Sequence, residues 1–185
     1  CIDRMTLRPG DDGEFTGTVG TLRDVSRQYR RQELLNGLIE RSREMMAATD
    51  TRAVTELVVS TAVEVFDLDL AVLRAYDPDA DALAPVVTST TADAVLGDRP
   101  TYSPTDGPVG RAFSEGELVV ERNLSERSGT DVTAVDIGAY LPIGDQYVLS
   151  LGHSGDEGLD DVTRGLLEVL GETAAAAIDR VTREE

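Results

Sequence analysis

The side chains that most often carry covalent or metal chemistry are scarce in this sequence. It contains one cysteine, Cys1, and one histidine, His153. One chain can therefore form neither an internal disulfide nor a zinc site of the Cys/His type. His153 could ligate a haem iron or accept a proton, although a sole histidine is more often a surface or strand-end residue. We keep His153 as a candidate ligand-binding residue.

Carboxylates are abundant, but their spacing matches no known site. Asp77, Asp79 and Asp81 alternate as in a calcium-binding loop, yet no glycine follows at the sixth loop position and no glutamate at the twelfth. A solvated turn explains the trio better. The sequence also lacks a P-loop and a Ser–Gly nucleophile elbow. We expect no metal site, no catalytic residue and no enzymatic activity in this chain.

The charge balance is the most marked property of the composition. Asp and Glu number 35 against 17 basic residues, all of them Arg, and the formal net charge is −18. Such a chain could be disordered or mimic a nucleic acid, but the acids are dispersed among regularly spaced apolar residues, which favours a folded domain. The sequence has no stripe of basic residues that could contact the phosphates of a nucleic acid, so we expect no nucleic-acid binding. An acidic, lysine-free surface resembles proteins of halophilic archaea, where molar salt shortens the Debye length to about 3 Å.

The length of the chain, its apolar runs and its cysteine content bear on domain number and cellular location. The 185 residues leave room for one sizeable domain and an appendage. No run approaches the roughly 20 apolar residues of a membrane helix, and no signal peptide is visible. A single cysteine suits a reducing cytoplasm, so we expect a cytoplasmic protein without a membrane segment. The chain starts without Met, and a targeting segment could precede it.

The first 49 residues read as a hairpin followed by a helix. Good strand formers flank the turn signal at 9–13 and continue to residue 23. An isolated hairpin is marginal in water, so we expect a sheet further upstream. From residue 26 to 49 the apolar spacing becomes helical, with a narrow stripe that suits either a dimer seam or a domain face.

The remaining residues alternate helices and short strands. The predicted helices and strands are, in chain order, helix 52–66, strands 70–76 and 83–89, a helix from 106 to 115, strands 118–120, 137–143 and 146–151, and a helix from 160 or 161 to 183. Residues 90–103 are expected to form a loop with one helical turn at most. This order predicts an α+β fold, an antiparallel sheet with helices packed on one face and long helices at both ends.

Local motifs in this order resemble the GAF domain. The segment 106–113, followed by Gly116 to Val120, looks like the family's central helix and next strand. The segments 140–144 and 148–152 look like its last two strands, and Leu166 to Ile178 looks like its closing helix. The resemblance covers roughly residues 50 to 181, and we predict a GAF domain over 50–182.

The segment 17–27 is similar to the end of a PAS domain, where a final strand enters an Asp-hydrophobic-Ser/Thr turn. The resemblance implies that residues 1–25 are the C-terminal strands of a truncated PAS domain and that 26–49 is a signalling linker helix. PAS–GAF tandems resemble haloarchaeal sensor histidine kinases and bacterio-opsin-activator-like regulators. The output domain would lie outside this sequence.

The GAF resemblance implies a ligand site between the sheet and residues 84–113. The polar and aromatic candidates there are Tyr102, Asp106, Arg111 and Phe113. A structural interpretation competes for three of them, with Phe113 in the core, Asp106 capping a helix and Arg111 solvated.

The resemblance also limits the cofactor. Bilin-binding GAF domains and GAF-type methionine sulfoxide reductases need cysteines inside the domain, and none is present. The cyclic-nucleotide signature includes lysine, which is absent too. Low aromatic content argues against a stacked flavin. We therefore expect no covalent bilin, and neither haem nor flavin, and the cofactor stays unknown.

Two functions in signal transduction remain open, besides a small enzyme, which we consider the weakest. One is a sensory module that binds a small molecule or relays a PAS signal through its terminal helices to an output domain. The other is a ligand-free dimerisation spacer. The narrow apolar stripes of both terminal helices predict a homodimer, and the implied outputs place the parent in two-component signalling or transcription regulation.

Overall fold

The computed structural model describes residues 2–9, 15–23, 26–95, 99–124, 135–154 and 159–184. It divides into two compact units, Cys1–Leu35 and Asn36–Glu185, which are described separately. Cys1, the turn expected at 10–13, the Asp24–Val25 turn and most of the polar loop expected at 123–131 lie outside the described residues.

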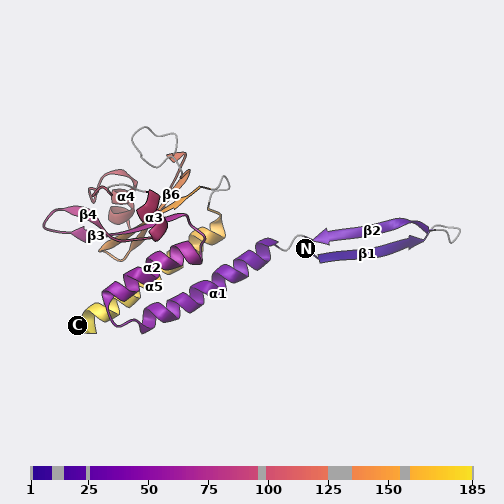
Figure 1. Ribbon diagram of the computed structural model, residues 1–185, viewed down its shortest axis with the longest axis horizontal. Coiled ribbons are helices and arrows are strands. Elements are labelled where there is room, and N and C mark those ends of the chain that lie inside the picture. Colours follow the sequence, from indigo (N-terminus) through magenta and orange to yellow (C-terminus); the bar gives the residue numbers. More distant parts are fainter. Residues whose placement is uncertain are drawn as a thin grey trace. The chain divides into compact units, whose positions relative to one another are not determined.

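The first unit contains a two-stranded antiparallel hairpin. Strands β1 (Ile2–Pro9) and β2 (Phe15–Arg23) pair with Ile2 opposite Arg23 (Figure 1). Helix α1 (Ser26–Ala47) follows. The predicted hairpin and the predicted helix are both confirmed.

The second unit is built on a five-stranded antiparallel sheet in the order β4-β3-β7-β6-β5. Its strands are β3 (Leu70–Asp77), β4 (Ala82–Thr88), β5 (Val119–Arg122), β6 (Ile137–Ile143) and β7 (Tyr147–His153). Its further helices are α2 (Thr51–Glu64), α3 (Thr90–Val95), α4 (Gly107–Glu115) and α5 (Asp161–Glu184). The predicted α+β fold class is confirmed.

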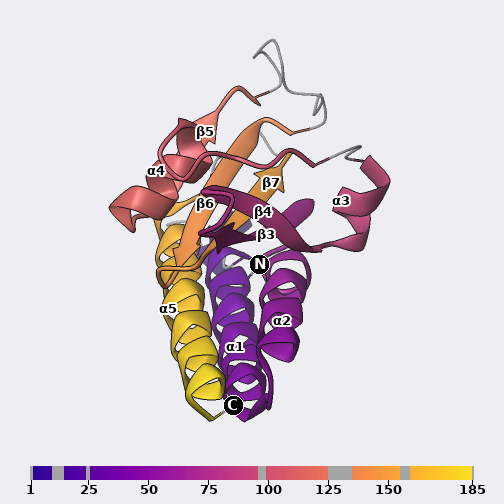
Figure 2. The ribbon, with the colours of Figure 1, turned by 90° about the vertical axis from the view of Figure 1, so that its left-hand side faces the viewer.

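Two long amphipathic helices cover one face of this sheet (Figure 2). The carboxylate of Asp50 accepts a hydrogen bond of 2.8 Å from the backbone N–H of Ala53, which starts α2. Asp160 accepts one of 2.7 Å from Thr163 and starts α5 in the same way. Both helices then turn a buried apolar stripe inward, and a Cβ on Gly171 of α5 would lie only 3.0 Å from the carbonyl oxygen of Pro142 in β6.

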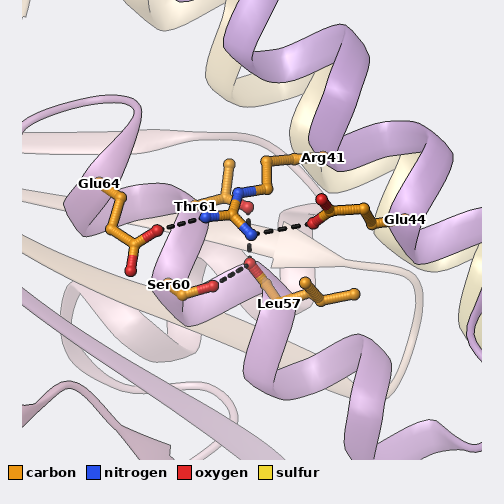
Figure 3. A network of polar contacts seen from close by, with 6 residues as sticks. All are labelled: Arg41, Glu44, Leu57, Ser60, Thr61 and Glu64. Carbon is orange, nitrogen blue, oxygen red and sulfur yellow. Dashed lines mark hydrogen bonds and ion pairs between the residues drawn. The ribbon is translucent and has the colours of Figure 1, made fainter.

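The part of α1 from Asn36 onward lies beside α2 and α5 (Figure 2). Gly37 allows a close approach, since a Cβ there would lie 2.8 Å from a methyl group of Val65, just after α2. Arg41 bridges Glu44 on its own helix, at 2.9 Å, and Glu64 on α2 (Figure 3). On the other side, Arg180 of α5 donates a hydrogen bond of 2.5 Å to the carbonyl oxygen of Ala48.

The short helix α4 lies against the opposite face of the sheet, where its Val109 and Ala112 pack against Leu83 and Val148. It ends at Gly116, whose φ of 68° is a left-handed conformation that glycine adopts without strain. Helix α3 occupies part of the segment predicted to be mainly loop. The sheet is therefore covered on both faces, and the face under α4 holds the candidate site.

Candidate ligand-binding site

Strand β3 places a charged side chain in the middle of the sheet. Successive residues of a strand point to opposite faces, so Leu73 points toward the long helices while Arg74 and Tyr76 point toward the α4 side. Arg74 lies opposite Val148 on the neighbouring strand β7. The face that sheet and α4 enclose is thus apolar except around Arg74.

Arg74 is almost fully buried, with 5% of its surface exposed. Its Nη1 donates a hydrogen bond of 2.8 Å to the hydroxyl of Ser150 on β7. Its guanidinium carbon lies 4.7 Å from the centre of the Tyr102 ring, which is within cation–π range. Its Nε is buried and has no hydrogen-bond partner in the described part of the chain.

No described carboxylate forms a salt bridge with Arg74. Burial lowers the pKa of its guanidinium from the ordinary value, and the nearby phenol groups of Tyr102 and Tyr140 oppose that shift. The charge of Arg99 lowers this pKa further. Arg99 itself is balanced by Asp93 of α3. Among the described residues Arg74 is therefore a buried cation without an ion-pair partner, which is costly unless something else supplies negative charge.

Tyr102 is fixed in place by its backbone although it lies outside the named strands. It forms a bridge with Leu83, in which the N–H of Leu83 donates to the Tyr102 carbonyl at 2.8 Å and the N–H of Tyr102 donates back at 3.1 Å. This bridge holds the Tyr102 ring against the sheet face. The structure places this predicted residue directly at Arg74.

Phe113 belongs to the apolar wall beside the Arg74 cluster, by which we mean Arg74, Tyr102, Tyr140 and Ser150. Its ring centre lies 5.0 Å from that of Tyr76. The wall consists of buried and half-buried apolar residues, namely Tyr76, Leu83, Val109, Ala112, Phe113, Val119 and Val148, and Tyr102 and Tyr140 pack against it. Phe113 is half-buried and packs against the core cluster of Leu83, Val109, Ala112 and Val148.

Asp106 and Arg111 lie apart from Arg74. Asp106 is exposed at the N-cap position of α4, but its side chain accepts no capping hydrogen bond. Arg111 is half-exposed and forms an ion pair of 2.8 Å with Glu121 on β5. None of their described contacts involves the Arg74 cluster.

His153 lies at the end of β7, next to a carboxylate. Its Nδ1 is 3.4 Å from Oδ2 of Asp69, and the same oxygen accepts hydrogen bonds from the backbone and the hydroxyl of Ser154, at 2.7 and 2.9 Å. The serine proton thus points to the aspartate and not to the imidazole. Ser154 and His153 therefore do not form the hydrogen bond of a nucleophilic Ser–His pair.

The sequence reasoning missed Arg74, Tyr140 and Ser150. One signal was available, because Arg74 interrupts the otherwise apolar run from Leu70 to Ala75. A charged residue inside a buried strand marks either an ion pair or a functional site.

The described residues contain no group of three or more His, Cys, Asp or Glu side chains that could hold a metal ion. Among them, no helix is both long and apolar enough to cross a membrane.

Solved structures of similar fold belong to two proteins named as enzymes and to a chemotaxis protein. The free methionine-R-sulfoxide reductase of Neisseria meningitidis, in complex with its substrate, is 14% identical with a TM-score of 0.70, over 89% of this chain and 96% of that one. The GAF domain of an Acinetobacter phosphoenolpyruvate-protein phosphotransferase is 13% identical with a TM-score of 0.67, over 82% and 95%. Residues 122 to 287 of a methyl-accepting chemotaxis protein are 16% identical with a TM-score of 0.63, over 78% and 98%.

No curated protein matches the chain significantly. The family model of the GAF domain matches residues 48–179, which is well over half of the sequence. The chain therefore belongs to the GAF domain family, whose domains are typical of sensory and signalling proteins.

Proposed function

We propose that this chain is a sensory module that binds a small molecule on the α4 side of its sheet. The observation that carries the proposal is Arg74, a buried cation that no described carboxylate balances. A fold that needed only a packed core could place an apolar side chain at this position. An unbalanced charge fixed by an aromatic ring and a hydroxyl is instead typical of a binding site.

The signal would leave through the long helices. Arg41 ties α1 to Glu64 of α2 (Figure 3). Arg180 ties α5 to Ala48, the residue after α1. A change in the sheet that shifts α2 or α5 would therefore also bias α1. On this proposal residues 1–25 are the end of a PAS domain and 26–49 is the linker, in a cytoplasmic sensor kinase or transcription regulator of a halophilic archaeon.

Native mass spectrometry of the purified chain tests ligand binding without presuming the ligand. Circular dichroism in the same volatile buffer first confirms that the protein is folded. We expect a native mass above the denatured mass by one small molecule, and loss of that molecule in an Arg74→Met variant. A native mass equal to the denatured mass, in protein freshly isolated from its own host, would contradict the sensory proposal.

The second candidate function, a dimerisation spacer, is favoured by exposed apolar residues on α1. Ile39 and Met46 are seven residues apart and are 51% and 45% exposed, which is the spacing of a helical dimer seam. We expect a dimer in size-exclusion chromatography with light scattering. Ile39→Glu should yield a monomer, while Val86→Glu, at a similarly exposed position of β4, should not. A wild-type monomer would exclude this candidate.

A further inference from the structure

We propose that the Arg74 cluster binds a small organic carboxylate that carries one negative charge. This inference rests on the proposed sensory function and names the class of its ligand. It is built from the charge balance around Arg74, the buried Nε without a hydrogen-bond partner in the described residues, and the chemistry of the surrounding wall.

The charge balance points to a monoanion. Two arginines lie close enough for the charge of Arg99 to act on Arg74. Asp93 balances Arg99, whereas Arg74 has no described acid partner. A ligand with one negative charge would neutralise the site, and a second charge would have to be buried without a partner.

The guanidinium edge fits a carboxylate. Nη1 of Arg74 is used by Ser150, and one face of the group lies on the Tyr102 ring. On the edge that Nε shares with Nη2, Nε is buried and has no hydrogen-bond partner in the described part of the chain. Two parallel N–H groups on that edge match the two oxygens of a carboxylate.

The wall selects an organic anion over an inorganic one. The residues that pack beside Tyr102 and Tyr140 include Leu83, Val148 and Phe113. An anion bound at Arg74 would lie on the sheet face that also carries Val148, the residue opposite Arg74 on β7. A short hydrocarbon tail gains free energy there by leaving water, whereas nitrate and phosphate have no apolar part that could gain it.

Binding is tested on the full chain with formate, acetate, propionate, butyrate and pyruvate as sodium salts, at constant chloride and ionic strength. Melting temperature and titration calorimetry report binding. We expect a saturable rise in melting temperature with at least one carboxylate, and none with propionamide, which has nearly the shape of propionate but no charge. Nitrate and phosphate should bind more weakly than that carboxylate.

Variants separate the site from general salt effects. Arg74→Met should weaken binding roughly tenfold or more, since a charged bidentate contact is lost. Arg74→Lys keeps the charge but not the two-pronged edge and should also bind more weakly. Arg52→Met removes an equal charge from an exposed position of α2, and it should bind like the wild type.

Two results would overturn the inference. One is that no carboxylate in the series raises the wild-type melting temperature more than that of Arg74→Met, and the other is tighter binding of nitrate, phosphate or propionamide. An uncharged molecule found by native mass spectrometry would refute the ligand class and leave the sensory function standing. Absence of every ligand in both experiments would refute both.

Discussion

Burial of the charged Arg74 side chain lowers the stability of the fold and marks the candidate ligand site. Arg74 is 5% exposed, and its guanidinium contacts the Ser150 hydroxyl and the face of the Tyr102 ring. In water the same group would satisfy all of its five donors. The fold therefore holds Arg74 in a state that an incoming anion would improve, which is the condition for ligand-dependent stabilisation.

Tyr147 provides a prediction about pH at the same scale. It begins β7, and burial raises the pKa of its phenol above the ordinary value. The folded state thus holds this proton more tightly than the unfolded state, where the pKa is about 10. The protonated phenol therefore contributes its full stabilisation below the unfolded-state pKa of about 10. This contribution is lost as the pH rises through the higher pKa of the folded state.

Urea unfolding between neutral and strongly alkaline pH measures the effect of Tyr147. The difference in unfolding free energy between wild type and Tyr147→Phe should be constant at neutral pH, and should shift against the wild type above pH about 10. A difference that stays constant over the whole range would show that the phenol ionises equally in both states.

At the scale of elements, α4 and the segment that carries Tyr102 are packed backbone to backbone. A Cβ on Gly110 would lie 2.7 Å from the Ser103 carbonyl oxygen and 2.8 Å from the Thr105 carbonyl carbon. Backbone atoms cannot turn aside as a side chain can, so Gly110→Ala should destabilise the domain by about 1–3 kcal/mol. It should also displace Tyr102 and weaken ligand binding.

Gly165→Ala is the matched control for this substitution. Gly165 lies in α5 with no atom within 4 Å of its added Cβ. Alanine there should stabilise the helix by about 0.5–1 kcal/mol. Thermal unfolding of the two variants measures this difference, and we expect Gly110→Ala to melt at the lower temperature. Equal stabilities would contradict the close packing of α4.

The Arg41–Glu64 pair gives a second prediction about elements. It joins α1 to α2, but both side chains are partly exposed, at 26% and 58%. Exposed pairs contribute little, so a double-mutant cycle with Arg41→Ala and Glu64→Ala should give a coupling of about 0.5 kcal/mol. A coupling near zero would remove this pair from the proposed path between the helices.

The elements were more predictable from sequence than the site. Helices α2 and α5 each have an apolar stripe and begin after a capping aspartate, Asp50 and Asp160, and both features are local in the sequence. The Arg74 cluster instead combines residues 74, 102, 140 and 150, which only the strand order β3-β7-β6 and the bridge at Leu83 bring together. The spacing of residues along the chain does not specify this strand order.

Net charge acts at the scale of the whole molecule. With a formal charge of −18 on 185 residues, folding brings like charges closer together than they are in the unfolded chain. Salt screens this repulsion over a distance that falls from about 10 Å at 0.1 M to about 3 Å at 1 M. The unfolding free energy should therefore rise with sodium chloride, by on the order of 1 kcal/mol over this range.

Urea is the appropriate denaturant for this measurement because it adds no ions. Glu168 and Glu172 are exposed on α5, so Glu168→Gln with Glu172→Gln lowers the net charge from −18 to −16 (−18 + 2) without disturbing the core. If repulsion causes the salt dependence, the double variant should be more stable at low salt and should gain less from added salt. Equal gains in both proteins would instead assign the effect to stronger burial of apolar surface in salt, and the acidic surface would then have no part in setting the stability of the domain.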